Sequence, residues 1–223
     1  MMTRREAIVY GLTSTLPDES TARLLEREFA RPDLSYILMS MPARRLIAKR
    51  WPNPDQAIPM GSLLKPFVAY AHGSPFPEIT CNGARDRCWK ASGHGRLTLP
   101  LALAYSCNAY FLALARDLQF DAWSQTPQAL LDAYCDLLTR APREILQGMR
   151  LSAKLGTARE IRCDAYAKTG TAPCRHSKKA PGDGYAVALY PATDTRFALL
   201  TSLDGAPGSH AARVSGEMLR RIS

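Results

Sequence analysis

Residues 58–67 read IPMGSLLKPF, and within them Ser62 and Lys65 form an SxxK element at the start of a predicted helix. Side chains three positions apart on a helix lie on one face, so the hydroxyl and the amine come within reach of each other. A serine is a weak nucleophile without an adjacent base. A lysine serves as that base when its surroundings lower its pKa to ~7–8. Alone, the element is far more typical of an N-cap serine beside a surface lysine.

Two further elements favour the catalytic interpretation. Ser106-Cys107-Asn108 is the only SxN element of the chain, and Lys168-Thr169-Gly170-Thr171 is the only KTG element and follows a predicted strand. SxxK, SDN and KTG are together the signature of class A β-lactamases and penicillin-binding proteins. All three types occur here in that order, which makes coincidence a poor explanation.

The residues between the motifs extend the match. Residues 81–83, 88–90, 93–95 and 106–111 read CNG, CWK, GHG and SCNAYF, and residues 146–150 read LQGMR. Together with the three motifs, these stretches resemble the transpeptidase domain of elongation-type class B penicillin-binding proteins. The resemblance covers roughly Ser35 to Arg220. The distance from Asn108 to Lys168 is shorter than is usual in that family, which implies a trimmed helical lobe.

The order of expected elements predicts an α+β fold. We expect a five-stranded, mainly antiparallel sheet flanked by both terminal helices, with an inserted all-α lobe at about residues 66–158. The pattern places strands at 35–40, 45–48, 163–168, 184–190 and 197–203. It places helices at 17–29, 63–72, 127–139, 142–153 and 211–221, and one or two long helices over 99–118. Residues 17–223 then form one transpeptidase-like domain, and residues 1–16 form a tail or a degenerate export signal.

The resemblance implies a role for each motif residue. Ser62 attacks the carbonyl between the two terminal D-alanines of a peptidoglycan stem peptide, and Lys65 accepts its proton. Ser106 relays a proton toward the leaving amine, and Lys168 keeps the cleft positive. The residues expected to bind substrate are Asn108, Thr169, Gly170 and Thr171. The expected partners are the stem peptide and β-lactams, which would acylate Ser62 as covalent inhibitors or substrates.

Three alternatives to an active transpeptidase or carboxypeptidase remain open: a serine β-lactamase, a penicillin sensor, and an inactive cleft that retains the three motifs in a trimmed lobe. A serine β-lactamase needs a base that activates water on the acyl-enzyme, and Glu144 and Glu160 are the candidates between SxN and KTG. Deacylation through Lys65, as in class D β-lactamases, is a second route to the same activity. A penicillin sensor would instead be acylated once and stay acylated.

Charge and hydropathy narrow the cellular setting. The chain carries 29 Lys and Arg against 20 Asp and Glu, a net charge of +9. No nucleic-acid-reading motif accompanies this charge, so we expect a solvated surface and no nucleic-acid partner. No apolar run approaches the ~20 residues that span a bilayer, so no integral membrane span is expected. Thr3-Arg4-Arg5 before an apolar stretch is similar to a shortened twin-arginine signal, and the resemblance implies a periplasmic or otherwise extracytoplasmic location.

Six cysteines are the remaining conspicuous feature. Cys81 and Cys88 bracket a short polar loop and are the best candidates for a disulfide. They lack the CxxC spacing typical of zinc or redox sites, and the chain has only four histidines, so no metal and no cofactor are expected. His94 has no evident Asp or Cys partner and is interpreted as structural. Cys107 is interpreted as a buried apolar residue, and Trp89 and Tyr110 as packing anchors.

Overall fold

The computed structural model describes residues 19–116, 124–174, 180 and 182–223. The expected tail or export signal at residues 1–16 therefore lies outside the described residues. Among the helices that are described, none is long and apolar enough to cross a membrane.

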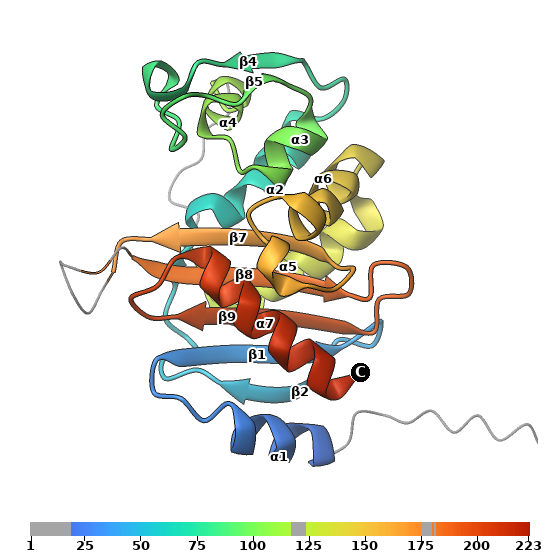
Figure 1. Ribbon diagram of the computed structural model, residues 1–223. Coiled ribbons are helices and arrows are strands. Elements are labelled where there is room, and N and C mark those ends of the chain that lie inside the picture. Colours follow the sequence, from blue (N-terminus) through green and yellow to red (C-terminus); the bar gives the residue numbers. More distant parts are fainter. Residues whose placement is uncertain (1–18, 117–123, 175–179, 181) are drawn as a thin grey trace, which may run out of the picture.

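One five-stranded sheet organises the molecule (Figure 1). Its strands run in the order β2-β1-β9-β8-β7, and each neighbouring pair is antiparallel. The strand bounds are β1 Leu34–Ser40, β2 Arg45–Arg50, β7 Tyr166–Ala172, β8 Asp183–Tyr190 and β9 Phe197–Leu203. The predicted five-stranded antiparallel sheet is confirmed.

Both faces of the sheet are buried, because apolar side chains point to each side in turn. On one face, Leu38 and Leu199 pack with helices α1 (Glu19–Glu28) and α7 (Gly208–Ile222). This arrangement confirms that the terminal helices flank the sheet, and Figure 1 shows α7 lying across the strands.

The opposite face packs against the remaining helices. Ile37 and Leu200 share a core with residues of α2 (Lys65–His72), α5 (Pro127–Arg140) and α6 (Arg143–Leu155). Helix α5 begins at a capping threonine, since Thr126 Oγ1 accepts a hydrogen bond from the Ala129 N–H at 3.3 Å, with proline at the first helical position.

The helical part agrees with its prediction in one respect and differs in another. The stretch expected as one or two long helices over 99–118 contains two short ones, α3 (Leu99–Ala104) and α4 (Asn108–Leu114), with Ser106 between them at a φ of 53°. The lobe also carries a hairpin of β4 (Ile79–Cys81) and β5 (Gly95–Leu97), so it is not all α. Three-residue strands rich in glycine and polar residues give no alternating pattern that would have predicted them.

Short elements complete the chain. Strands β3 (Ile58–Pro59) and β6 (Ser124–Gln125) pair with each other, and the 3-10 turns are η1 (Gly61–Leu64), η2 (Gly83–Asp86) and η3 (Arg159–Ile161). Strand β7 starts three residues after the predicted strand at 163 and continues through the KTG motif. Thr169 and Thr171 favour an extended strand, and their preference outweighs that of Gly170, which suggested a turn.

Candidate active site

Ser62 lies in turn η1, which packs directly on β7 at the edge of the sheet. Gly170 makes this approach possible: a Cβ at that position would lie 3.0 Å from Leu63 Cγ and 3.3 Å from the Met60 carbonyl oxygen. From the other side, Tyr134 donates a hydrogen bond to the Leu63 carbonyl at 2.6 Å. The nucleophile turn is therefore held against the KTG strand by close backbone contact and by a buried tyrosine.

The Ser106 hydroxyl joins the two motif lysines. Lys65 Nζ lies 3.1 Å and Lys168 Nζ 2.9 Å from Ser106 Oγ, and both are buried. Lys65 also donates to the Ser106 carbonyl and to Asn108 Oδ1, each at 2.6 Å. Lys168 makes a further bond to the Thr169 carbonyl at 2.7 Å. All three motifs thus meet through one serine.

Burial changes the protonation of both lysines. It lowers the pKa of Lys65 to about 8, against the opposing influence of the Cys107 and Cys88 thiols. It also holds the pKa of Lys168 well below the ordinary lysine value, and the charge of Lys65 acts in the same direction. A lysine with a pKa near 8 accepts a proton at neutral or mildly alkaline pH, as a general base requires.

The turn that carries Ser106 is conformationally unusual. A φ of 53° is uncommon for a residue with a side chain and is kept only where the surroundings impose it. Here the Cys107 N–H donates to the Ala102 carbonyl at 2.9 Å, and the Ser106 carbonyl accepts bonds from Lys65 and from Trp89. Strain at this position is balanced by polar contacts on both sides of the turn.

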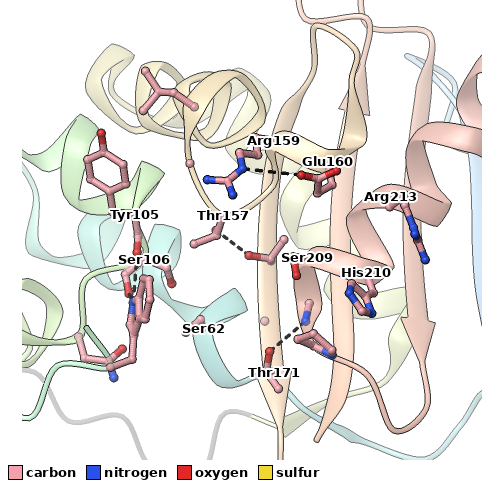
Figure 2. Close-up of a pocket in the computed structure, with 18 residues that line it drawn as sticks. Ser62, Tyr105, Ser106, Thr157, Arg159, Glu160, Thr171, Ser209, His210 and Arg213 are labelled. Atoms are coloured by element: carbon pink, nitrogen blue, oxygen red, sulfur yellow. Dashed lines mark hydrogen bonds and ion pairs between the residues drawn. The ribbon is translucent and has the colours of Figure 1, made fainter. Parts of the chain in front are cut away.

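A cavity of about 750 Å³ opens beside Ser62 (Figure 2). Six of the eight predicted site residues line it, namely Ser62, Ser106, Asn108, Thr169, Gly170 and Thr171. Lys65 and Lys168 lie buried behind its wall. The hydroxyls of Thr169 and Thr171 are already engaged, the first donating to Thr157 Oγ1 at 2.7 Å and the second accepting from the Gly208 N–H at 3.0 Å.

Several cavity residues escaped the sequence analysis. They are Trp89, Tyr105, Leu155, Gly156, Thr157, Arg159, Pro207, Gly208, Ser209, His210 and Arg213. Figure 2 labels Arg159 and Arg213 among these residues. Trp89 comes from the loop after η2 and Tyr105 from the end of α3, and the others come from the end of α6, the turn after it and the start of α7. All lie outside the three motifs, so no short pattern marks them.

Trp89 corrects one prediction directly. Tyr110 is fully buried, as expected of a packing anchor, but Trp89 is 59% exposed at the cavity. Its indole Nε1 donates to the carbonyls of Tyr105 at 3.2 Å and Ser106 at 3.1 Å. The polar loop around it, between Cys88 and Lys90, was the signal that this tryptophan is not a core residue.

The cysteine predictions are also corrected. Cys81 and Cys88 are both free thiols, so they form no disulfide. His94 does have cysteine partners, since its Nδ1 lies 3.7 Å from Cys81 Sγ and 3.4 Å from Cys88 Sγ. With Cys107 these residues bring four ligand atoms within 4.8 Å of one another, a group that could hold a metal ion despite its lack of CxxC spacing.

The two glutamates proposed for deacylation are separated by the fold. Glu160 lines the cavity, where Arg159 and Arg162 lie 3.7 and 3.6 Å from its carboxylate. Glu144 lies in the first turn of α6 and is absent from the cavity wall. Only Glu160 therefore remains a candidate on geometric grounds.

Comparisons with known proteins identify the fold. No family model and no curated protein matches the sequence. Among solved structures, the transpeptidase domain of the FtsI4 D,D-transpeptidase from Legionella pneumophila is 13% identical with a TM-score of 0.65, covering 92% of this chain and 94% of that one. Pseudomonas aeruginosa PBP2 in complex with WCK 5153 is 16% identical with a TM-score of 0.72, covering 92% and 74%. The transpeptidase domain of Burkholderia pseudomallei penicillin-binding protein 3 is 12% identical with a TM-score of 0.68, covering 90% of each chain.

Proposed function

We propose that this chain, whose fold is that of a penicillin-binding-protein transpeptidase domain, is a serine D,D-transpeptidase or carboxypeptidase. Its substrate would be the D-Ala-D-Ala end of a peptidoglycan stem peptide, and its intermediate an acyl-enzyme on Ser62. The observation that carries the proposal is the Ser106 hydroxyl, which lies within 3.1 Å of both Lys65 and Lys168 beside the Ser62 turn. A serine with only a structural role would not require two buried lysine amines beside its hydroxyl.

In this proposal, acylation uses these groups in turn. The neutral amine of Lys65 takes the proton from Ser62 Oγ as that oxygen bonds to the substrate carbonyl carbon. The C–N bond to the terminal D-alanine then breaks, and its nitrogen receives a proton through the Ser106 hydroxyl. Removal of the acyl group by a second amine completes transpeptidation, and removal by water completes hydrolysis.

The residues of the β7 wall would bind the substrate and stabilise the negative charge of the transition state. The backbone N–H groups of Ser62 and Thr171 would form the oxyanion hole, each donor contributing about 3 kcal/mol to the transition state. Thr169 and Thr171 would exchange their present hydroxyl contacts for the terminal carboxylate, and Asn108 would hold the substrate amide. Activity on peptidoglycan implies an extracytoplasmic location, which belongs to the same proposal.

Intact-protein mass spectrometry after incubation with benzylpenicillin tests the nucleophile. We expect a lasting adduct of one penicillin on the wild type and none on Ser62→Ala. A matched control is Ser35→Ala, a serine near the start of the interior strand β1 and outside the cavity lining, which should be acylated like the wild type. An adduct that survives in Ser62→Ala, or no adduct together with no loss of drug from solution, would contradict the proposal.

A β-lactamase is the second candidate, because Glu160 lies in the cavity wall. In that case the drug disappears from solution while no adduct accumulates. Turnover of a chromogenic β-lactam that falls in Glu160→Gln but survives in Glu144→Gln would favour it. Persistence of the adduct in both variants favours the transpeptidase.

A further inference from the structure

The cavity beside Ser62 continues past the KTG strand into a part that is walled by η3 and by the first turns of α7. We call this part the α7 arm, and Figure 2 labels the five residues that define it: Arg159, Glu160, Ser209, His210 and Arg213. None of them takes part in the acylation of Ser62 proposed above. The cavity volume of about 750 Å³ is also far more than two alanine residues fill, so the arm has room for another part of a substrate.

Two glycines fix the position of α7 relative to the reacting groups. At Gly208, where α7 begins, a Cβ would meet the Gly170 carbonyl oxygen of the KTG motif. At Gly216, a Cβ would meet the Ile161 carbonyl oxygen of η3. The helix therefore runs from the KTG strand to η3. Since Arg213 follows Gly208 by five residues, it lies about 7.5 Å along the helix axis from the KTG contact.

The charges of the α7 arm favour an anion. Arg213 is exposed in the cavity and forms no ion pair with any residue that the structure describes, and His210 lies three positions before it on the same helix face. Glu160 is the one acidic residue among the described residues of the lining, and Arg159 and Arg162 already lie 3.7 and 3.6 Å from its carboxylate. Because the planar guanidinium of arginine binds carboxylates through paired N–H groups, a carboxylate is the ligand that this part of the cavity fits.

The donor peptide does not reach the α7 arm. In the proposed function its terminal carboxylate binds at Thr169 and Thr171, so the donor ends beside the start of α7. The acyl acceptor differs in this respect, because microscopic reversibility requires its amine to enter where the leaving amine departed. The rest of the acceptor then occupies the space beyond Thr169, which is the α7 arm.

We propose that the α7 arm is the acyl-acceptor subsite, and that Arg213 with His210 selects amines that carry a second, remote carboxylate; the assignment rests on the proposed function. The carboxylate next to the amine would replace that of the departed D-alanine at Thr169, and the remote one would pair with Arg213. The acceptor nitrogen bonds to the acyl carbon, the ester bond to Ser62 Oγ breaks, and the proton lost by the nitrogen returns to Ser62 Oγ through the Ser106 hydroxyl. Such an acceptor directs the acyl-enzyme to transpeptidation instead of hydrolysis.

A matched pair of acceptors isolates the remote carboxylate. D-2-aminopimelate has a carboxylate at each end of its carbon chain, and the carbon–carbon bonds of about 1.5 Å between them place the two groups about 7.5 Å apart when extended. This length agrees with the position of Arg213 along α7. The ω-amide of the same compound has the same shape and lacks the remote charge.

Partition of the acyl-enzyme between transfer and hydrolysis is the first test, with N-benzoyl-D-alanyl thioglycolate as the thioester donor. We expect the wild type to transfer its acyl group about fivefold more to D-2-aminopimelate than to the ω-amide, the effect of a partly exposed arginine–carboxylate pair. Arg213→Gln should lose most of this preference. Arg221→Gln is the matched control, because it removes an arginine from the same helix outside the cavity lining.

The ratio of transfer to hydrolysis is taken within each variant, so a change in the acylation rate does not affect it. Equal transfer from the wild type to both acceptors would overturn the proposal. An undiminished preference in Arg213→Gln, or a preference lost equally in Arg221→Gln, would do the same.

Binding without acylation separates this subsite from the proposed function. Saturation-transfer NMR titration of Ser62→Ala should show D-2-aminopimelate binding about fivefold more tightly than the ω-amide, and the added Arg213→Gln change should abolish the difference. If that difference appears but Ser62 is never acylated, the carboxylate site stands and the proposed function is wrong. If Ser62 is acylated but Ser62→Ala binds both compounds equally, the subsite is wrong and the proposed function stands.

Discussion

The two walls of the cavity are built by different means. The wall formed by β7 belongs to a sheet whose register runs from Tyr166 to Ala172 against β8, and its motif lysine is fully buried. The wall formed by the Ser106 turn and Trp89 has no strand ladder. It is held by side-chain hydrogen bonds from Lys65, Lys168 and Trp89, and by the contact between the Cys88 and Cys107 thiols.

This contrast separates stability from catalysis. Removing apolar area from the sheet wall should weaken the whole domain, because both cores of the molecule share the same strands. Removing a polar contact from the Ser106 wall should leave the domain folded and displace the groups that handle protons. Substitutions in the two walls should therefore have different effects, on stability for the sheet wall and on acylation for the Ser106 wall.

Ser106→Ala should produce the largest loss. Lys65 and Lys168 would lose the hydroxyl that they share, and the leaving amine would lose its proton relay. General acid–base groups contribute about 10²–10⁴-fold, so we expect penicillin acylation to slow by roughly 10³-fold. Stopped-flow acylation kinetics measure this directly.

Two controls distinguish the hydroxyl from the backbone. Ser106→Gly also lacks the hydroxyl but accepts a φ of 53° without strain, so it should be equally slow and at least as stable. If Ser106→Gly acylated at the wild-type rate, the hydroxyl would have no role and the turn geometry would be the important feature.

Leu199→Ala tests the opposite wall. Leu199 is fully buried between β9 and α7, and truncation of such a leucine costs about 3 kcal/mol, or roughly 10²-fold in the folding equilibrium. Urea unfolding should give a lower midpoint with an unchanged slope. The acylation rate of the folded fraction should stay at the wild-type value, and a tenfold fall would show that the walls are not independent.

The same contrast explains what the sequence could predict. The strands of the sheet wall have long apolar runs bounded by turns, and each of the three motifs is a short continuous stretch of sequence. Both features could therefore be predicted from the sequence. The register that brings Gly170 against Leu63 follows from the pattern only once the strand is known to continue through KTG.

The Ser106 wall was less predictable because its contacts join residues distant in sequence and polar in character. His94 and Cys107 are 13 positions apart and follow no spacing motif, yet both belong to one group of ligand atoms. Trp89 was misassigned because an aromatic residue is more often buried than used as a donor at a cavity rim. Arg159 begins η3 and Arg213 lies within α7, and the two come to line one cavity only in the folded chain.

The pH dependence of acylation isolates the base on the Ser106 wall. Burial lowers the Lys65 pKa from 10.5 to about 8, so the amine is increasingly neutral, and able to accept a proton, as pH rises through 8. The rate should fall about tenfold per pH unit below that value and level off above it. Benzylpenicillin acylation from pH 6 to 9.5, with circular dichroism recorded at each pH to confirm folding, measures it. A rate that is flat from pH 6 to 8 would exclude neutral Lys65 as the base.

Ser152→Ala is expected to have the smallest effect, and the opposite sign. Ser152 in α6 is as buried as Ser106, but its hydroxyl has no hydrogen-bond partner among the described residues. An unsatisfied buried hydroxyl costs about 1 kcal/mol, and alanine is a better helix former, so the variant should melt about 3 °C higher. Acylation should be unchanged. If Ser152→Ala melted lower, its hydroxyl would be satisfied by water, whereas a slower acylation would mean that α6 transmits packing changes to the Ser106 turn through α3.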